Sequence, residues 1–372
     1  MRKKSTFEEG LKVMIVGDYA WPWYQDACAD ALELIGCKVY RFGLFKDFKY
    51  WIEGHTEPFY LSFWHRLQYR FQFGPVVYNI KKKLIQKSEN VQPDVVWFYN
   101  VHLIGKRTIK KLRRLLPKTI FVQYSNDDPF SEKGTFFLWR KFLLSIQLFH
   151  CHFAYRSSNI ADFRAYGVEN VHLLRSYFIP ECDYPELSES IPEHFKCDVV
   201  FAGHYEDDGR IEMLESICQA GFDLNLYGGG WDRALKKLKA NSPLLNQYPV
   251  APVTGADYRY AICGAKVAIC FLSKLNNDSY TRRNFQIPAM GTAMLSEYTE
   301  DLATLYISDK EAMFFKDNDE MLRKLKVLME SVELRKSIAK AGYARVQNDG
   351  HDVVSRMAMW LEVIKKTKED IK

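Results

Sequence analysis

The chain has 372 residues, 47% of them hydrophobic and 26% charged, which is typical of a globular protein with two domains. It contains no apolar run of 18 residues and no apolar region after its basic N-terminus, so we expect neither a membrane-spanning helix nor a signal peptide. Eight scattered cysteines form no C-x-x-C pair and nine histidines show no zinc-like spacing, so we expect reduced thiols, a cytoplasmic protein and no metal site.

The net charge of +6 is unevenly distributed along the chain. Residues 1–180 contain 27 Lys and Arg against 16 Asp and Glu, whereas the remaining residues contain 25 against 30. The excess of cations in the first half is typical either of an ordinary solvated surface or of contact with an anionic partner. Candidate partners are a lipid phosphate, a membrane surface and a nucleic acid.

The N-terminal elements form a strand, helix and strand unit. Apolar residues 13–16 predict a buried strand, an apolar stripe within residues 27–35 predicts a helix, and residues 38–43 predict a second strand. The unit lacks the G-x-G-x-x-G fingerprint of dinucleotide-binding proteins. Asp18 follows the first strand, where it either contacts an acceptor or caps a turn.

Aromatic and basic side chains alternate across residues 59–83, within a longer stretch, residues 45–90, that we expect to be irregular. Such a segment can lie on a membrane interface, stack on an acceptor or pack on the core, and the sequence does not choose among these.

Polar residues follow the next two predicted strands, residues 93–99 and 119–124. Carboxyl ends of parallel strands are where open α/β sheets bind ligands, so these residues are candidates for the acceptor side. Residues 127–129, just after the second of these strands, read D-D-P. Either of the two carboxylates can act as a base or bind a sugar hydroxyl, or can simply cap a helix. The candidates at these two strand ends are Asn100, His102, Asp127 and Asp128.

The composition predicts the domain boundaries. Strand and helix patterns up to residue 178 complete an N-terminal Rossmann-like domain, 1–178, and the proline-containing range 179–197 is predicted as a linker. Residues 198–350 predict a second domain, in which a helix at 331–341 ends at Gly342. A final helix, within 351–372, is expected to cross back to the first domain.

The second half repeats the α/β pattern. A strand at 198–201 leads through Gly203 to a helix at 211–220, and a helix N-terminus after a glycine-containing strand end is an anion site. A later strand ends in three glycines that permit close backbone approach. Arg210 either contacts the anion or pairs with neighbouring acids, and Trp231 either stacks on a base or fills the core. The candidate donor contacts here are Gly203, His204, Arg210, Gly228 and Trp231.

The most informative stretch is residues 272–297, where a strand gives way to a polar loop, a short helix and another strand. The loop carries Lys274, Arg282 and Arg283, cations suited to an anionic ligand. Residues 279–297 read S-Y-T-R-R-N-F-Q-I-P-A-M-G-T-A-M-L-S-E. This segment, together with the D-D-P piece, resembles the pattern of the CgeB-like (spore-maturation-type) glycosyltransferases of the GT-B class. Alternatively, the segment is only a tight helix start against a sheet.

The resemblance implies an α/β protein with two Rossmann-like, doubly wound parallel-sheet domains that face a central cleft. The second domain would bind a nucleotide-sugar and the first an acceptor. Related transferases grip the donor ribose with an acidic residue where this chain has Gln286, which forms hydrogen bonds without charge assistance.

We therefore expect a glycosyltransferase acting on a bacterial glycan, a lipid-linked intermediate or a surface polysaccharide. No metal or other cofactor is expected, and residues 59–83 are the candidate membrane contact. The alternatives are a DNA- or protein-modifying transferase, a sugar-nucleotide epimerase or hydrolase, and a non-catalytic nucleotide-binding module. The candidate catalytic residues are Asp127, Asp128, His102, Arg210 and Lys274, and the donor-binding set adds Arg282, Arg283 and Gln286.

Overall fold

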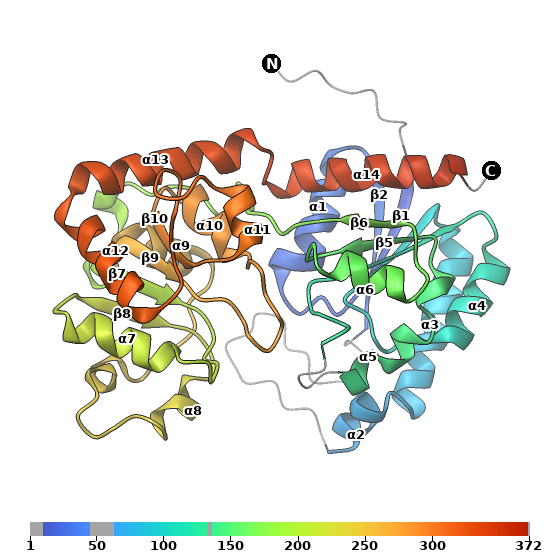
Figure 1. Ribbon diagram of the computed structural model, residues 1–372. Helices are drawn as coiled ribbons and strands as arrows, with labels where there is room; N and C mark the ends of the chain where they lie inside the picture. The colour runs from blue at the N-terminus through green and yellow to red at the C-terminus, as the bar shows by residue number, and fades with distance from the viewer. Residues whose placement is uncertain (1–9, 45–62, 132–135, 371–372) are drawn as a thin grey trace. The chain divides into compact units, whose positions relative to one another are not determined.

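The computed structural model describes residues 10–44, 63–131 and 136–370, and the chain divides into two compact units (Figure 1). The first unit comprises Met1–Arg175 together with Val353–Lys372, and the second comprises Ser176–Asp352. The range expected to be a linker, 179–197, thus belongs to the second unit. None of the described helices is long and apolar enough to cross a membrane.

The first unit is built on a six-stranded parallel sheet with the order β2-β1-β3-β4-β5-β6. Buried apolar residues dominate the central strands, as the short apolar runs of the sequence predict. The strands are β1 (Lys12–Gly17), β2 (Lys38–Gly43), β3 (Val95–Tyr99), β4 (Ile120–Ser125), β5 (Cys151–Ala154) and β6 (Val171–Leu173).

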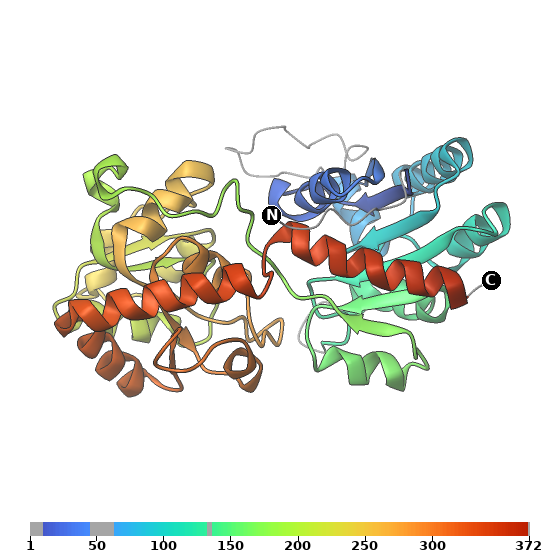
Figure 2. The same ribbon diagram turned by 90° about the horizontal axis from the view of Figure 1, so that it is seen from above.

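Helices cover both faces of this sheet, as Figure 2 shows. Neighbouring residues of β3 point to opposite faces: Phe98 packs in the core beneath α3 and α4, whereas Trp97 lies 4.8 Å from Trp360 of α14, between ring centroids. The helical elements are η1 (Pro22–Asp26), α1 (Ala27–Leu34), α2 (Phe63–Phe71), α3 (Pro75–Val91), α4 (Lys106–Leu115), α5 (Phe136–Leu143), η3 (Ile146–Leu148), α6 (Asn159–Ala165) and α14 (Val353–Asp370).

The helices α2 and α3 correct the expectation that residues 45–90 are irregular. Pro75 stands in the first turn of α3, where its missing N–H costs nothing, and Val77, Ile80 and Leu84 are buried at helical spacing. Residues 59–62 of the segment singled out in the sequence lie outside the described residues.

The second unit has a five-stranded parallel sheet with the order β11-β10-β9-β7-β8. The chain order of the strands changes direction between β9 and β7, as in doubly wound folds. In such folds the ligand sites lie at the carboxyl ends of the strands. The strands are β7 (Cys197–Ala202), β8 (Leu224–Tyr227), β9 (Ala265–Cys270), β10 (Ala293–Glu297) and β11 (Met313–Phe315).

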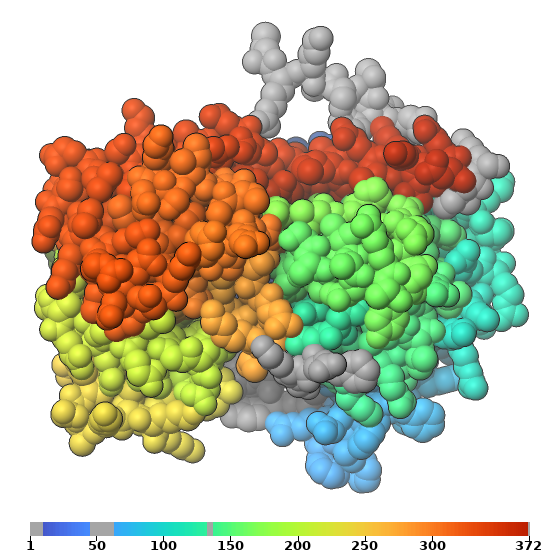
Figure 3. Space-filling model, in the orientation of Figure 1, coloured from blue at the N-terminus to red at the C-terminus, as the bar shows by residue number. Residues whose placement is uncertain are grey.

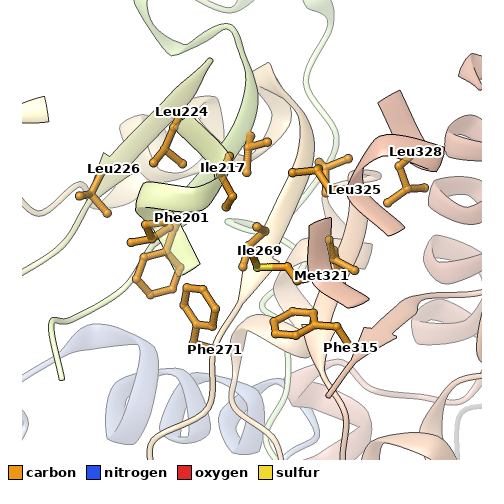
Figure 4. Packing of buried hydrophobic residues seen from close by; sticks show 14 of the residues in the cluster. Phe201, Ile217, Leu224, Leu226, Ile269, Phe271, Phe315, Met321, Leu325 and Leu328 are labelled. Carbon is orange, nitrogen blue, oxygen red and sulfur yellow. The ribbon is translucent and has the colours of Figure 1, made fainter. Parts of the chain in front are cut away.

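One face of this sheet packs on helices α7 and α12. Phe201 and Ile269 from the strands meet Ile217 of α7 and Leu325 of α12 in one buried cluster (Figure 4). The helical elements of this unit are η4 (Ser188–Ser190), η5 (Glu193–Phe195), α7 (Arg210–Gln219), α8 (Trp231–Leu235), η6 (Pro243–Gln247), α9 (Gly255–Gly264), α10 (Arg283–Ala289), α11 (Glu300–Leu305), α12 (Asn318–Glu330) and α13 (Val332–Asn348).

Gly342 does not end a helix, contrary to the expectation from the sequence. Helix α13 continues through it to Asn348. A Cβ atom at this position would lie 2.5 Å from the carbonyl oxygen of Glu311, so the glycine allows close packing of the helix on the neighbouring loop.

Candidate functional site

Glycines bring the carboxyl ends of β7 and β8 together in the second unit. The amide of Gly203 donates to the carbonyl of Tyr227 at 2.8 Å, and the amide of Tyr205 donates to Gly229 at 3.0 Å. Gly228 has a φ of 142°, and a Cβ atom there would lie 1.9 Å from the Gly203 carbonyl oxygen. Only glycine fits this position, and the two strand ends therefore present closely spaced backbone along one edge of the sheet.

Arg283, at the start of α10, lies against this edge. Its Nη2 atom donates to the carbonyl of Phe271 at 2.9 Å and its Nη1 atom to that of Ala202 at 3.4 Å, so it joins the ends of β9 and β7. Its Nε atom is buried and has no hydrogen-bond partner among the described residues. The thiol of Cys270 lies near the guanidinium. A Cβ atom on Gly203 would lie 2.6 Å from Arg283 Nη1, which ties this glycine to the arginine.

His204 stands next to the same glycines and is exposed. Gly229 leaves room for its ring, since a Cβ atom there would approach the imidazole to 3.1 Å. The pKa of His204 is lowered by partial desolvation and then by the positive charge of Arg283, while Glu206 acts in the opposite direction. A neutral imidazole beside a fixed guanidinium can donate to an anion and gains a proton when one binds.

Arg210 is held inside the loop that precedes α7. Its side chain is 3% exposed, its Nε and Nη2 atoms bind the two oxygens of Asp208 at 2.7 and 2.6 Å, and Nη1 donates to the carbonyl of His204. Of the two alternatives that the sequence left open for Arg210, the structure shows the pairing with a neighbouring acid. This fork fixes the carbonyl and hence the backbone of His204.

Lys274 lies on the loop after β9 and its side chain is 55% exposed. It pairs with Glu297 at the end of β10 at 2.8 Å, and the other oxygen of Glu297 accepts from the amide of Leu272 at 2.5 Å. Ser273 donates to Glu206 at 2.9 Å, which connects this loop to the loop after β7. Glu297, the last residue of β10, was not among the candidates, although they too lie at strand ends.

Gln286 and Arg282 converge on Asp183, a buried carboxylate from the range expected to be a linker. The Nε2 atom of Gln286 donates to Asp183 Oδ1 at 2.8 Å, and Arg282 Nη2 lies 3.1 Å from Oδ2. The hydroxyl of Tyr258 donates to the amide oxygen of Gln286 at 3.2 Å. The side chain of Gln286 is thus fixed from both ends.

Trp231 lies in the core of the second unit. It is 1% exposed, its Nε1 atom donates to the carbonyl of Gly203 at 3.0 Å, and its ring packs against Phe201 and Tyr205. Its ring has no exposed face for a base, so the structure shows the core-filling alternative for this residue.

In the first unit, two carboxylates lie close together at the carboxyl ends of β1 and β4. Burial raises the pKa of Asp18, and the charge of Asp127 acts in the same direction, against hydrogen bonds from Ala20 and Gln25. Asn100, which follows β3, donates to Asp127 Oδ2 at 3.0 Å. The structure therefore brings together three of the acceptor-side candidates.

His102 and Asp128 have different surroundings. The ring of His102 lies between Tyr69 and Trp139, at centroid distances of 5.3 and 5.6 Å, and burial lowers its pKa to about 4. Asp128 Oδ1 accepts from the amide of Phe130 and from Asn159 Nδ2, both at 3.0 Å, as in a turn-forming aspartate. The neutral imidazole and the bonded carboxylate both have structural roles in this arrangement.

Tyr69 of α2 belongs to the aromatic and basic segment singled out in the sequence, residues 59–83, but was not among the individual site candidates. The pKa of its hydroxyl is raised by burial and then by the charges of Asp18 and Asp127. Its ring also contacts His102. Among the described residues, no group of three or more His, Cys, Asp or Glu side chains is arranged to hold a metal ion.

Comparison with known proteins agrees with this geometry. Residues 210–362 match a family described as "Glycosyl transferase-like", and no curated protein sequence matches the chain significantly. HepE from Anabaena, solved in complex with UDP-glucose, is similar in structure, with a TM-score of 0.66 at 14% identity over 95% of this chain and 99% of that one.

Two further structures have similar folds. Sucrose-phosphate synthase from Thermosynechococcus elongatus gives a TM-score of 0.68 at 12% identity, over 95% of this chain and 98% of that one. A putative UDP-N-acetylglucosamine 2-epimerase from Listeria monocytogenes gives 0.56 at 12% identity, over 97% of each chain.

The two parallel-sheet units and these neighbours confirm the predicted fold class: the chain has a GT-B fold. Together with the family match, they support a glycosyltransferase.

Proposed function

We propose that this protein transfers a sugar from a nucleotide-sugar donor to an acceptor and that its second unit binds the donor. The observation that carries the proposal is the glycine-lined edge at β7 and β8 with Arg283 against it. A fixed guanidinium at a place where glycines permit close approach to the backbone suits a diphosphate. A neighbour with the same fold was solved with UDP-glucose, which supports a nucleotide-sugar as the ligand.

We assign the diphosphate to Arg283 and His204, beside the close approach of the Gly203 and Gly228 backbones. The guanidinium of Arg283, held by the carbonyls of Ala202 and Phe271, supplies a fixed positive charge. Lys274 is the second cation, since its exposed ammonium can exchange Glu297 for a phosphate. Arg210 then acts as a positioning residue, because its fork with Asp208 holds the His204 backbone.

The donor ribose is assigned to Gln286. One N–H of its amide is bound to Asp183 and its oxygen accepts from Tyr258, which leaves one N–H and one lone pair for sugar hydroxyls. Asp183 and Arg282 fix the amide in this position. Gln286 lies within the segment that resembles the CgeB-like transferases. Membership of the CgeB-like subtype is part of the proposal.

The acceptor is assigned to the first unit, where Asp127 and Asp18 are the candidate bases. A carboxylate with a raised pKa is a better general base near neutral pH. An anionic or glycan acceptor, such as a lipid-linked or surface-polysaccharide intermediate, suits the excess of cations in residues 1–180.

The departing nucleoside diphosphate would be stabilised by fixed cations and backbone amides, with no metal ion or other cofactor in the proposed mechanism. A cytoplasmic location is part of the proposal. It fits the five buried cysteine thiols, Cys28, Cys37, Cys151, Cys197 and Cys270.

The test is incubation of the full chain with a panel of nucleotide-sugars. Release of the nucleoside diphosphate, accelerated by a glycan acceptor, is the expected result. The Listeria neighbour makes an epimerase the second candidate, because a similar fold serves that class. Interconversion of two nucleotide-sugars without release would establish the epimerase, and binding without turnover would establish a nucleotide-binding module.

A further inference from the structure

The first unit exposes a concentration of large apolar side chains on α2, the start of α3 and α5. Trp64 is 72% exposed and Phe73 81%, values far above those of the same residue types in the core. Figure 3 shows α2 at the surface of its unit. We call this surface the α2–α5 face, and its exposed apolar residues are Phe63, Trp64, Phe71, Phe73, Tyr78, Phe137 and Leu144.

The face is continuous across elements that are distant in the sequence. The rings of Phe71 and Phe137 pack edge to face with centroids 6.4 Å apart. The side-chain Nε2 atom of Gln72, directly after α2, donates to the backbone carbonyl of Leu138, and Lys141 Nζ donates to the backbone carbonyl of Gln72. These bonds hold α2 and α5 as one surface, so the exposed rings form a patch and not a scatter of single residues.

The charge on this face has one sign. Helices α2 and α5 contain no Asp or Glu. The pKa of Lys141 is lowered to about 8 by burial and then by the charges of Lys81 and Arg140, so like charges from two helices are crowded together. The following cations have no ion pair with a carboxylate among the described residues: Arg66, Arg70, Lys81, Lys82, Arg140 and Lys141.

The α2–α5 face therefore combines two unfavourable features: exposed apolar area and positive charge without carboxylate partners. An anionic lipid bilayer relieves both, because aromatic rings enter the boundary between headgroups and acyl chains while Lys and Arg meet lipid phosphates. Single-stranded nucleic acid fits less well. Its bases need open ring faces along a groove, whereas Phe71 and Phe137 are packed edge to face and Arg140 covers the Phe137 ring at 5.6 Å.

We propose that the α2–α5 face docks the first unit on an anionic membrane surface. The proposal rests on this surface alone and does not depend on the nature of the donor. It adds α5, through Phe137, Arg140 and Lys141, to the segment that the sequence singled out. The enzyme would thereby meet an acceptor that is held at the membrane.

The test is cosedimentation of the full chain with vesicles of phosphatidylcholine, with and without phosphatidylglycerol. The wild type should bind the anionic vesicles at least about tenfold more tightly, and added salt should release it. Two double variants, Trp64→Ala with Phe73→Ala and Arg66→Glu with Arg70→Glu, should each weaken binding by about tenfold or more. Their melting temperatures should stay near that of the wild type, because the four side chains are exposed.

Matched controls come from the second unit. Leu187, which is 72% exposed, serves as Leu187→Ala, and the exposed pair Lys336 and Lys340 of α13 serves as a double change to Glu. Both controls should bind vesicles like the wild type. Equal binding of face variants and controls would overturn the proposal, and so would wild-type binding to a single-stranded oligonucleotide that is tighter than to vesicles and lost in the same variants. Hydrolysis of the nucleotide-sugar should be unchanged in all of them, which separates this proposal from the donor-site assignment.

Discussion

Gln286 donates a hydrogen bond of 2.8 Å to the buried carboxylate of Asp183, a residue 103 positions earlier in the chain. The relationship explains why this chain has an amide where the GT-B transferases it resembles have a carboxylate. A glutamate at 286 would face Asp183 within hydrogen-bonding distance, and two buried like charges so close cannot both stay ionised. The amide instead donates to Asp183 and accepts from Tyr258, so both ends of the side chain are satisfied.

The first prediction follows from this pair. Gln286→Glu should lower the free energy of unfolding by about 1–3 kcal/mol at neutral pH, because it replaces the donor to Asp183 Oδ1 with a second carboxylate and leaves Arg282 as the charged partner of Asp183. In this variant, burial and mutual repulsion should raise the pKa of both carboxyls above their values in the unfolded chain. The variant should therefore regain stability at pH values below the unfolded-state pKa and lose it as the pH rises through the folded-state pKa. Thermal melts of the variant across pH 4–8 measure this.

The matched control is Asp183→Asn combined with Gln286→Glu, which restores one carboxylate and one amide in exchanged positions. It should recover part of the stability and flatten the pH dependence. A single variant as stable as the wild type at pH 8 would show that the bond between Gln286 and Asp183 contributes nothing.

The second prediction separates the two arginines of the donor edge. Arg283→Lys should reduce turnover by about two orders of magnitude, since a lysine cannot reproduce the guanidinium that we assign to the diphosphate. Arg210→Ala should chiefly destabilise the fold, by about 3–5 kcal/mol, because it leaves the largely buried Asp208 without its partner. Steady-state kinetics and thermal melts of both variants decide it, and a wild-type rate for Arg283→Lys would place the diphosphate elsewhere.

The third prediction concerns the base in the first unit. Asp18 is active only when ionised, and its raised pKa should place the acidic limb of the rate profile above the usual aspartate range. Asp127→Asn removes a neighbouring negative charge and should therefore move this limb to lower pH. If Asp127 is itself the base, the same variant should instead lose about 10²–10⁴-fold in turnover.

Asp18→Asn completes that comparison and should abolish the acidic limb if Asp18 is the base. The control is Asp128→Asn, whose carboxylate is bonded to a backbone amide and to Asn159, and which should change stability more than the pH profile. An acidic limb that stays in place in all three variants would remove these carboxylates from the mechanism.

The fourth prediction is that turnover survives chelation. The proposed mechanism stabilises the leaving diphosphate with Arg283, His204 and backbone amides, so EDTA should leave the rate unchanged. Rates measured with EDTA, and again with added Mg²⁺ or Mn²⁺, provide the test. Loss in EDTA that Mg²⁺ restores would require a metal in the donor site.

The strands, and with them the fold class, could be predicted from local sequence patterns. Short apolar runs with polar boundaries are typical of a buried parallel sheet, and this placed β7 within one residue of its actual bounds. The sequence also indicated which strand ends are candidate ligand sites, because glycines and charged residues cluster after β7 and β9. Helices α2 and α3 were missed because the exposed aromatic residues of the α2–α5 face obscure their helical period.

Which of the candidate side chains share a partner could be read only from the folded chain. Arg210 and Arg283 look alike in sequence, but one is neutralised by Asp208 and the other retains a buried Nε atom without an oxygen partner among the described residues. Asp183, Glu297 and Tyr69 were not individual candidates, because their roles depend on partners that only folding brings near. Periodicity reports the burial of a segment along the chain, whereas hydrogen bonds and charge pairs are set by the distance between atoms in space.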